Sequence, residues 1–371
     1  MKNINEETKA YAHWLHRIDG LGNKTITKLL EICDIKTLFH APPKEAVKRV
    51  LNVTQQKAFF AAFKNRDPLE EYAILKKEKI NFTCTLSDDY PSRLLQVHDA
   101  PFGLYYKGAL PDEAPSVAII GARICSEYGR YMARQLGTEL AAAGVQVISG
   151  MALGVDGIAQ KGAVAAGGRS FAVLGSGVDV CYPEENRTLY ERLPERGGVI
   201  SEYAPWKQPE AKCFPPRNRI IAGLADAVLV VEARKKSGTL ITVDMALEQG
   251  KEVFAVPGRV TDRLSDGCNF LIRQGAGIAF SAQDVLDSLY GIGSPVTEEQ
   301  PDRRKPDLTS LEEALLLIVD IRPVSVNTVY EQLIARGVRA TVPTIMNTLI
   351  ELCFKGYLQQ EGGFFMRRIT A

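Results

Sequence analysis

The sequence predicts an α/β protein whose core is a doubly wound, mainly parallel sheet, with a small helical domain before it and another small domain after it. Three observations support this prediction. From residue 81 to about 290, apolar runs alternate with helical patterns, which is typical of a parallel sheet covered by helices. Before residue 66, apolar side chains recur at helical spacing. At 291–307, a stretch rich in Gly, Pro and charge has no apolar periodicity.

We therefore expect a helical domain over residues 1–66, a core over 67–290, a linker over 291–307 and a last domain over 308–371. The length of 371 residues is enough for two or three domains, of which the largest could bury a substantial core.

The composition excludes two broad classes of protein. Of the residues, 46% are hydrophobic and 24% charged, with 45 basic residues against 44 acidic ones. A disordered chain would combine low hydrophobicity with high net charge, and a membrane span would need roughly 18 or more consecutive apolar residues. Neither pattern occurs in the sequence. The charge balance also argues against a uniformly basic surface, so any basic patch must be local.

The cysteines and histidines narrow the chemistry. The seven cysteines are scattered without a CxxC pair, which indicates reduced apolar side chains rather than a zinc site or a disulfide framework. The first 20 residues lack the apolar stretch of a signal peptide, so we expect a cytoplasmic protein. All four histidines precede residue 100, so the core has no imidazole to act as a base. We expect no metal and no cofactor.

The first domain contains a turn at Gly20-Leu21-Gly22 between two helical patterns. Such a hairpin resembles helix-hairpin-helix and SAM-like modules, some of which offer backbone N–H groups to DNA phosphates. An ordinary αα-hairpin inside a small helical bundle is an equally good interpretation.

The core reads as an extended Rossmann-like fold. Six strands are expected, preceded by extra strands at Asn81–Leu86 and Leu104–Lys107; the six are Val117–Ile120, Val145–Ser149, Phe171–Leu174, Val199–Ser201, Ala227–Val231 and Glu252–Ala255. Helices are expected between them, at Glu127–Ala143, Asp156–Ala166, Asn186–Arg196, Asn218–Leu224 and Ile241–Gln249.

The last domain reads as a winged helix, with helices from about Leu311, at Val326–Ala335 and at Pro343–Lys355, and a hairpin that turns at Glu361-Gly362-Gly363. From Asp302 to Ala371 there are nine basic and eight acidic residues. A DNA-reading domain usually carries a stronger basic footprint, so a protein-docking or regulatory role is about as good an interpretation.

Small residues follow each expected strand of the core. In an open parallel sheet, ligands bind outside the carboxyl ends of the strands, so these residues share one rim. Glycine lets backbone N–H groups approach an anion, and helix N-termini favour negative charge. Five such turns with interspersed Arg and Lys favour an anionic ligand; they are Gly121-Ala122-Arg123 with Ser126, Gly150-Met151-Ala152, Gly175-Ser176-Gly177, Glu202-Tyr203 and Arg234 to Thr239.

A local basic segment lies between Ala204 and Lys236, where seven basic residues face three acidic ones and where Trp206 and Phe214 also occur. Basic side chains beside aromatic rings suit single-stranded nucleic acid, since Lys and Arg follow the phosphates while a ring stacks on a splayed base. A solvated loop anchored by Phe214 is the alternative. Arg217-Asn218-Arg219 at a helix start favours phosphate binding, because two guanidiniums there could each hold a phosphate.

Nothing in the core forms a recognisable catalytic set. There is no GxxxxGK[ST] motif, and the first turn does not read GxGxxG. Asp156, Glu202 and Glu232 lie near strand ends, but no nucleophile, base and orienting group accompany them. We expect Asp156 to cap the helix that begins at Gly157, and Glu202 or Glu232 to hold an arginine.

Long motifs resemble the DNA-processing protein A (DprA/Smf) family. They are VAIIGARICSEYGR (117–130), VISGMALGVDGIAQKGAVAAGG (147–168), AVLGSGVDVCYPEENRTLY (172–190), SEYAPWKQP (201–209), FPPRNRIIAGL (214–224), VVEARKKSGTLITVDMALEQGKEVFAVPG (230–258) and GCNFLIRQGA (267–276). The resemblance covers essentially the whole chain, because the helical first domain and the winged helix also follow that family's fullest layout.

This resemblance implies a non-enzymatic, dimeric protein that binds single-stranded DNA, protects incoming DNA in natural transformation (competence) and loads RecA recombinase onto it for DNA recombination, also where single-strand-binding protein is present. It implies dimerisation through the Rossmann domain, with 267–280 as the candidate segment. The expected DNA contacts, with the rim residue Gly150 included, are Gly121, Arg123, Ser126, Gly150, Arg187, Lys212, Phe214, Arg217, Asn218 and Arg219. Ala122 replaces the usual serine of the first motif, and Lys212 stands beside Ala211, where relatives often have lysine.

Two alternatives of other classes remain open. One is a Rossmann-like nucleotide phosphoribohydrolase. Ser237-Gly238-Thr239 weakly resembles part of the Pro-Gly-Gly-x-Gly-Thr-x-x-Glu motif of those enzymes, although Thr242 stands where the catalytic Glu would be. The other is a transcription regulator that acts through the winged helix.

Overall fold

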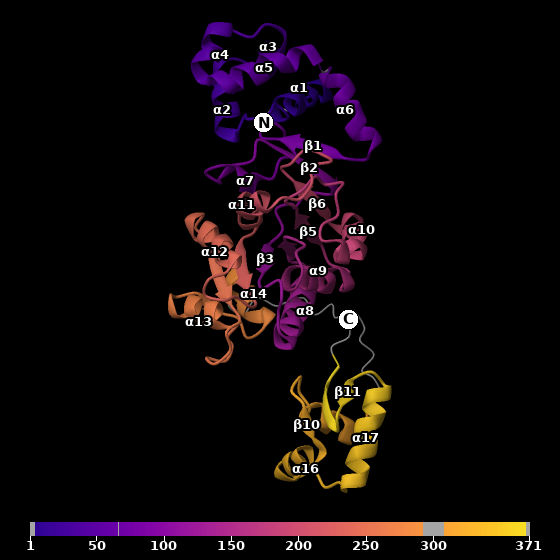
Figure 1. The fold of residues 1–371 in the computed structure, drawn as a ribbon. Helices are drawn as coiled ribbons and strands as arrows, with labels where there is room; N and C mark the ends of the chain where they lie inside the picture. The colour runs from indigo at the N-terminus through magenta and orange to yellow at the C-terminus, as the bar shows by residue number, and fades with distance from the viewer. Residues whose placement is uncertain (1–3, 66, 292–307, 369–371) are drawn as a thin grey trace. The chain divides into compact units, whose positions relative to one another are not determined.

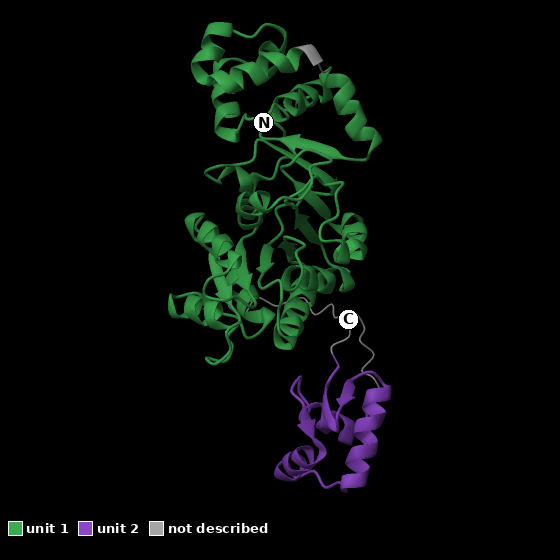
Figure 2. Cartoon of the chain, in the orientation of Figure 1, with its two compact units in different colours: residues 1–296 green, residues 297–371 purple. Residues whose placement is uncertain are grey.

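The computed structural model describes residues 4–65, 67–291 and 308–368 (Figure 1). The chain divides into two compact units, residues 1–296 and residues 297–371 (Figure 2). The finer boundary expected at residue 66 stays a prediction. The linker expected over 291–307 lies, from residue 292 on, outside the described residues.

The first unit begins with a layer of short helices. Asn5 starts the first of them because its side chain accepts a hydrogen bond from the Thr8 N–H, and Glu6 and Glu7 follow in the first turn. The expected turn at Gly20-Leu21-Gly22 lies between the first two helices, and Gly20 has a φ of 81°. The helices are α1 (Glu6–His16), α2 (Asn23–Ile32), α3 (Ile35–His40), α4 (Lys44–Val50), α5 (Val53–Asn65) and α6 (Pro68–Lys77).

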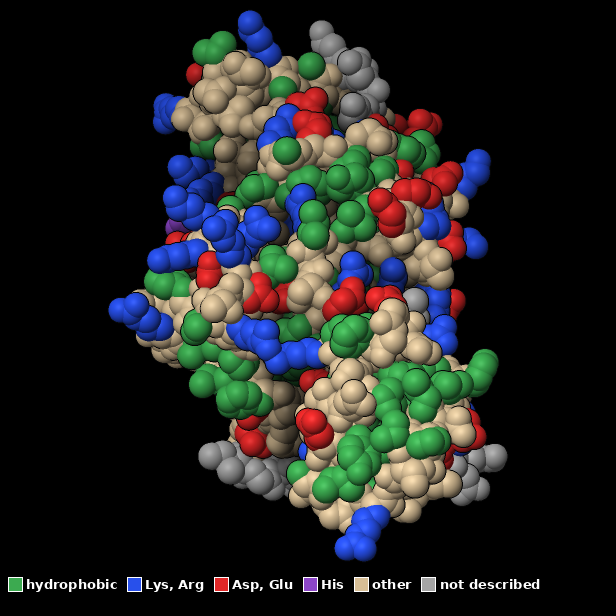
Figure 3. Space-filling view, turned by 60° about the horizontal axis from the view of Figure 1, so that its bottom comes forward, with side chains coloured by type: hydrophobic (Ala, Val, Ile, Leu, Met, Phe, Trp, Pro, Cys, Tyr) green, Lys and Arg blue, Asp and Glu red, His purple; other side chains and the backbone are tan. Residues whose placement is uncertain are grey.

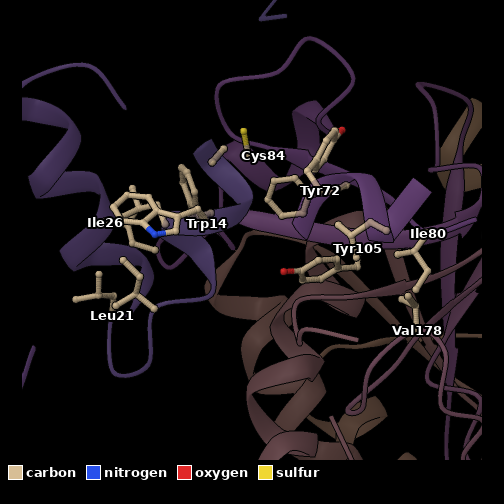
Figure 4. Packing of buried hydrophobic residues seen from close by; sticks show 14 of the residues in the cluster. Trp14, Leu21, Ile26, Tyr72, Ile80, Cys84, Tyr105 and Val178 are labelled. Carbon is tan, nitrogen blue, oxygen red and sulfur yellow. The ribbon is translucent and has the colours of Figure 1, made fainter. Parts of the chain in front are cut away.

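This helical layer shares an apolar core with the first strands of the sheet. Trp14 of α1 is buried and lies edge-on to Phe39, with ring centroids 5.0 Å apart. The same cluster continues through Tyr72 of α6 to Tyr105 and Val178, which belong to the sheet side (Figure 4). The layer is therefore packed onto the sheet rather than tethered to it.

His16 lies partly buried at this junction and makes the structure sensitive to pH. Its Nε2 is 2.8 Å from the carbonyl oxygen of Glu202, and burial lowers the pKa of the imidazole, with nearby Arg17 adding slightly to the shift and Glu202 opposing it. Unfolded His16 takes up a proton below about pH 6.5, whereas folded His16 does so only at lower pH. Stability contributed by the neutral ring is thus present above pH 6.5 and lost as the pH falls.

We expect the free energy of unfolding to decrease by at most about 1.4 kcal/mol per pH unit below pH 6.5 on account of His16. Urea denaturation of the wild type and of His16→Asn at pH 7.5 and 5.5 measures this as the difference between their two pH dependences. Equal pH dependence in both proteins would rule it out.

The core sheet has nine described strands in the order β1-β2-β6-β5-β4-β3-β7-β8-β9. β1 (Asn81–Cys84) pairs antiparallel with β2 (Gly103–Gly108), and β2 pairs antiparallel with β6. The remaining neighbours are parallel; these strands are β3 (Ser116–Ile120), β4 (Gln146–Ser149), β5 (Ser170–Val173), β6 (Gly198–Ser201), β7 (Ala227–Val230), β8 (Glu252–Ala255) and β9 (Gly277–Ile278). The doubly wound, mainly parallel sheet predicted from the sequence is confirmed.

Helices cover both faces of the sheet (Figure 1). Val117 and Ile119 of β3 face one apolar cluster and Ala118 and Ile120 face the other, which is the alternation expected of a strand buried on both sides. The first cluster includes residues of α8 (Glu127–Ala142), α9 (Val155–Ala165) and α14 (Ala282–Tyr290), and the second includes residues of α7 (Ser92–Leu95), α11 (Phe214–Leu224), α12 (Gly238–Glu248) and α13 (Asp266–Arg273). Next to β6 lies α10 (Arg187–Arg196), preceded by the short turn η1 (Glu184–Asn186).

Three expectations about helix starts are wrong. α12 begins at Gly238 rather than Ile241. α11 begins at Phe214 rather than Asn218, because Pro215 and Pro216 fit the first turn of a helix, where no N–H is needed. A 3-10 turn, η2 (Ala211–Cys213), precedes it. Asp156 does not cap α9, whose N-cap is Gly154; the carboxylate of Asp156 instead accepts a hydrogen bond from the Gly150 N–H at 3.1 Å.

The second unit has the expected winged-helix arrangement around its own apolar core. Thr309 and Glu312 form a capping box that starts its first helix. The elements are α15 (Ser310–Leu316), β10 (Val324–Ser325), α16 (Val326–Ala335), α17 (Val342–Phe354), β11 (Leu358–Glu361) and β12 (Phe364–Arg367), with the strands in the order β10-β12-β11. Among the described residues of the chain, none of the helices combines the length and the hydropathy needed to cross a membrane.

Candidate nucleic-acid interface

A cleft of about 770 Å³ opens outside the carboxyl ends of β3 and β7. The winding of the sheet reverses between these strands, since β4, β5 and β6 lie on one side of β3 and β7, β8 and β9 on the other. Ligands of open α/β sheets bind at such a point. The cleft is lined by the loop after β3, the start of α11 and the segment from Arg234 to Thr239.

The structure brings six of the ten predicted contact residues together here. Gly121, Arg123, Phe214, Arg217 and Asn218 line the cleft, and Gly150 lines a smaller adjoining cavity of about 70 Å³ together with Arg123, Phe214 and Arg217. The other four, Ser126, Arg187, Lys212 and Arg219, lie outside the lining of both cavities.

Phe214 is the centre of an aromatic and cationic stack. The ring of Tyr182 lies 5.7 Å from it at an interplanar angle of 24°. The guanidinium of Arg123 lies 5.4 Å from the Phe214 ring centroid, and that of Arg217 lies 6.0 Å from it. Tyr182 is 44% exposed and Arg123 is exposed, so part of this stack faces solvent. It therefore offers a flat apolar surface beside a positive charge.

Arg217 is not a free phosphate ligand. It is only 5% exposed, and its Nη1 donates to the carbonyl oxygens of Gly150, at 2.9 Å, and of Val173. Burial lowers the pKa of Arg217 to about 10, a shift that the neighbouring carboxylate of Asp156 opposes; burial likewise raises the pKa of Asp156. A Cβ on Gly150 would lie 2.6 Å from the Arg217 guanidinium, so this position has no room for a side chain.

Arg219 is likewise held by hydrogen bonds within the protein. It is 9% exposed, and its Nη2 donates to both carboxylate oxygens of Glu202 at 2.7 and 2.9 Å. Glu202 in turn accepts a hydrogen bond from Asn23 of α2 at 2.9 Å. The expectation that Glu202 holds an arginine is confirmed. Arg219 thereby connects the core to the helical layer and does not face the cleft.

Ser126 is the N-cap of α8. Its hydroxyl accepts from the Gly129 N–H at 3.1 Å and donates to the buried carboxylate of Glu232, which also accepts from the Ser126 N–H at 2.9 Å. Glu232 thus holds a serine rather than an arginine. A Cβ on Gly121 would lie 2.7 Å from a methyl carbon of Val155, so glycine is needed there for close packing.

Arg187 and Lys212 are exposed and paired with nearby acids. Arg187 lies 2.6 Å from Glu184, and Lys212 lies 2.7 Å from Glu210. Hydrogen bonds from Lys207 and Lys212 lower the pKa of Glu210 to about 2. Exposed pairs of this kind are weak, so both basic side chains could exchange their partner for a phosphate.

The N-terminus of α12 closes the other side of the cleft. Ser237 is its N-cap residue and lines the cleft, but makes no capping hydrogen bond with its side chain. Its Oγ is buried and has no hydrogen-bond partner among the described residues. The exposed Arg234, Lys235 and Lys236 precede it. Positive charge, a helix N-terminus and an unpartnered hydroxyl therefore lie together on this side of the cleft, which is an arrangement that favours an anion.

Two components of this cleft were not among the residues predicted as contacts. Tyr182 was quoted only as part of a motif, and it lies five residues beyond the strand-end turn Gly175-Ser176-Gly177. Arg234 and Ser237 were placed on the rim as part of a segment but not singled out.

On the face shown in Figure 3, Lys and Arg side chains gather along one side of the molecule.

The buried carboxylates near the cleft are all engaged by the fold. Asp156 accepts from Gly150, Glu202 from Arg219, and Glu232 from Ser126. Across residues 4–65, 67–291 and 308–368, no group of three His, Cys, Asp or Glu side chains is placed to hold a metal ion.

Comparison with known proteins gives one consistent family. The family model described as "DNA recombination-mediator protein A" matches residues 81–290. DNA processing protein DprA of Streptococcus pneumoniae is 45% identical over 206 residues, which are 54% of this chain and 71% of that protein. Protein Smf of Escherichia coli is 36% identical over 289 residues, which are 76% of this chain and 75% of that protein.

Solved structures agree with this result. The crystal structure of DNA processing protein A from Streptococcus pneumoniae superposes with a TM-score of 0.65 at 36% identity, over 77% of this chain and 98% of that one. DNA processing protein A from Helicobacter pylori, whose structure concerns its single-stranded DNA binding mode, gives a TM-score of 0.51 at 30% identity, over 57% of this chain and 95% of that one.

Proposed function

The chain belongs to the DNA recombination-mediator protein A (DprA/Smf) family, and from this premise we propose that it binds single-stranded DNA in the cleft outside β3 and β7. The observation that carries the proposal is the stack of Arg123, Phe214 and Tyr182 at the mouth of that cleft. The binding of single-stranded DNA by the Helicobacter pylori relative supports it.

In this proposal the two sides of the cleft have separate tasks. A base splayed out of the strand would stack on the rings of Phe214 and Tyr182, which needs no particular base. The adjoining phosphates would meet Arg123 on one side and, on the other, Arg234 with the free Ser237 hydroxyl and the α12 N-terminus. Arg187 and Lys212 would add weaker contacts outside the cleft.

We propose further that the protein holds DNA without cleaving it. The carboxylates nearest the cleft are occupied by hydrogen bonds within the fold, and Thr242, in the position of the hydrolase glutamate, is a buried side chain at 3% exposure. A cleft lined by aromatic rings, arginines and backbone N–H groups suits the binding of a nucleic acid rather than acid and base catalysis.

The remaining parts of the proposal follow from the family. We propose that the protein protects incoming single-stranded DNA and loads RecA recombinase onto it, also in the presence of single-strand-binding protein. We propose a homodimer through the Rossmann domain near residues 267–280. The exposed apolar side chains of Phe270, Ile278 and Phe280, which are 38%, 41% and 69% exposed, support that placement.

Fluorescence anisotropy with a labelled oligothymidylate and the matching duplex, across a salt series, tests the binding proposal. We expect tighter binding to the single strand, with log K falling linearly against log salt. Arg123→Ala should weaken single-strand binding by about 5-fold and reduce the salt slope by about 0.7, the value for one lost phosphate contact.

The matched control is Arg196→Ala. Arg196 is an exposed arginine at the end of α10, just before the amino end of β6, whereas the cleft lies outside the carboxyl ends of the parallel strands. It should bind like the wild type. Equal affinity for duplex and single strand, or identical behaviour of the two arginine variants, would contradict the proposal.

A further inference from the structure

The helical layer carries a local excess of positive charge that the cleft does not use. Residues 20–65 contain eight Lys or Arg against three Asp or Glu, in a chain whose total charge is +1. The basic residues are Lys24, Lys28, Lys36, Lys44, Lys48, Arg49, Lys57 and Lys64, and the acidic ones are Glu31, Asp34 and Glu45.

Part of this charge is exposed and unpaired. Lys36 and Lys48 form ion pairs with Glu7 and Glu45. Lys24 and Lys28 are exposed, lie one turn apart on α2 and have no ion-pair partner among the described residues. The exposed Arg49 belongs to α4, which packs against α2, so a third positive charge lies on the neighbouring helix. We call Lys24, Lys28 and Arg49 the α2–α4 face.

The α2–α4 face is connected to the edge of the rim by a partly buried network. Asn23, the first residue of α2, donates to Glu202 at 2.9 Å and accepts from the Phe102 N–H at 2.9 Å. Glu202 directly follows β6, and Arg219 of α11 binds its carboxylate. Arg219 is five residues beyond Phe214 on the same helix, which is a rise of about 7.5 Å. Lys24, the first lysine of α2, therefore directly follows a residue that is linked to α11, the helix that begins with the cleft residue Phe214.

The connecting network holds one guanidinium and two carboxylates, so it carries no net positive charge. Arg219 is shared between Glu202 and Asp99, so the network presents no free cation. Positive charge resumes at Lys24, outside the network. Exposed lysines that are neither paired nor arranged as bidentate donors suit a polyanion with evenly spaced charges, which is the chemistry of a nucleic-acid backbone.

We propose that the α2–α4 face binds backbone phosphates of the same DNA strand after it leaves the cleft. This second contact surface rests on the proposed function, because it takes a strand that the cleft already holds. It is independent of base sequence and acts only on strands long enough to reach beyond the cleft.

Anisotropy with oligothymidylates of 6 and 20 nucleotides distinguishes the two surfaces. For Lys24→Ala/Lys28→Ala we expect affinity for the 20-mer to fall by about 5- to 10-fold at 0.1 M salt and its salt slope to fall by about 1.4, for two lost phosphate contacts on a single strand. Affinity for the 6-mer should not change. Arg123→Ala should weaken both lengths.

Lys77→Ala/Lys79→Ala is the matched control, since it removes two exposed lysines at the end of α6, on the other side of the helical layer from α2 in Figure 1. It should leave both lengths unchanged. If Lys24→Ala/Lys28→Ala behaves like this control while Arg123→Ala weakens binding, the proposal of a second contact surface is wrong and the proposal of DNA binding in the cleft stands.

Three other outcomes also overturn the proposal. Equal losses for both lengths would mean that the α2 variant acts through the fold. A loss confined to a duplex probe would assign the face to double-stranded DNA. Failure of the wild type to bind either oligonucleotide would remove the proposed function and this surface with it.

Discussion

Arg217→Met should lower the free energy of unfolding by about 2–6 kcal/mol, at about 1–3 kcal/mol for each of the two buried carbonyl oxygens that lose their donor. The substitution leaves the buried carboxylate of Asp156 without its neighbouring cation. It also leaves the carbonyl oxygens of Gly150 and Val173 without the donor that Arg217 supplies. Urea denaturation followed by circular dichroism measures the change, with Arg196→Ala as the exposed control.

A second variant separates a structural role from a DNA contact. Arg217→Met/Asp156→Asn removes the uncompensated charge and should recover part of the lost stability. Weak DNA binding by an Arg217 variant does not show a phosphate contact unless its stability is unchanged. Wild-type stability of Arg217→Met together with lost binding would reverse this interpretation and make the arginine a ligand.

Phe214→Ala should weaken binding of single-stranded DNA by about 1–3 kcal/mol, or roughly 5- to 150-fold, because it removes the ring on which a base would stack. The same change removes contacts with Tyr182 and with two guanidiniums, so its effect on binding should exceed that of Arg123→Ala. Anisotropy at fixed salt measures it, and urea denaturation reports any accompanying loss of stability.

Two substitutions at the same position test the stacking itself. Phe214→Tyr keeps the ring and should keep most of the affinity, whereas Phe214→Leu keeps an apolar side chain and should lose affinity like Phe214→Ala. Similar affinities for the Tyr and Leu variants would show that Phe214 acts only as a core residue. A double-mutant cycle with Tyr182→Ala then measures how strongly the two rings are coupled.

The fold was largely predictable because the relevant patterns are local. The six strands expected after residue 116 lie within one residue of those observed, since each is a short apolar run with turn residues at its ends. The start of α11 was placed four residues too late, although Pro215 and Pro216 are well tolerated in a first helical turn.

The candidate site was predictable as a place but not residue by residue. Residues after β3 and β7 could be assigned to one rim from the topology rule alone. The burial of Arg217 and Arg219 could not be predicted, because their partners Gly150, Val173, Glu202 and Asp99 are distant in sequence. An arginine at a helix start looks the same in sequence whether it faces solvent or the core.

The partly buried network of Asn23, Glu202 and Arg219 limits how far the cleft and the α2–α4 face can move relative to each other. Hydrogen bonds between a carboxylate and a guanidinium in a low-dielectric setting resist distortion. The cleft and the α2–α4 face are therefore held at a fixed separation that does not adapt to the DNA. We therefore expect the oligonucleotide length beyond which affinity per protein chain stops increasing to be set by the protein and not by the strand.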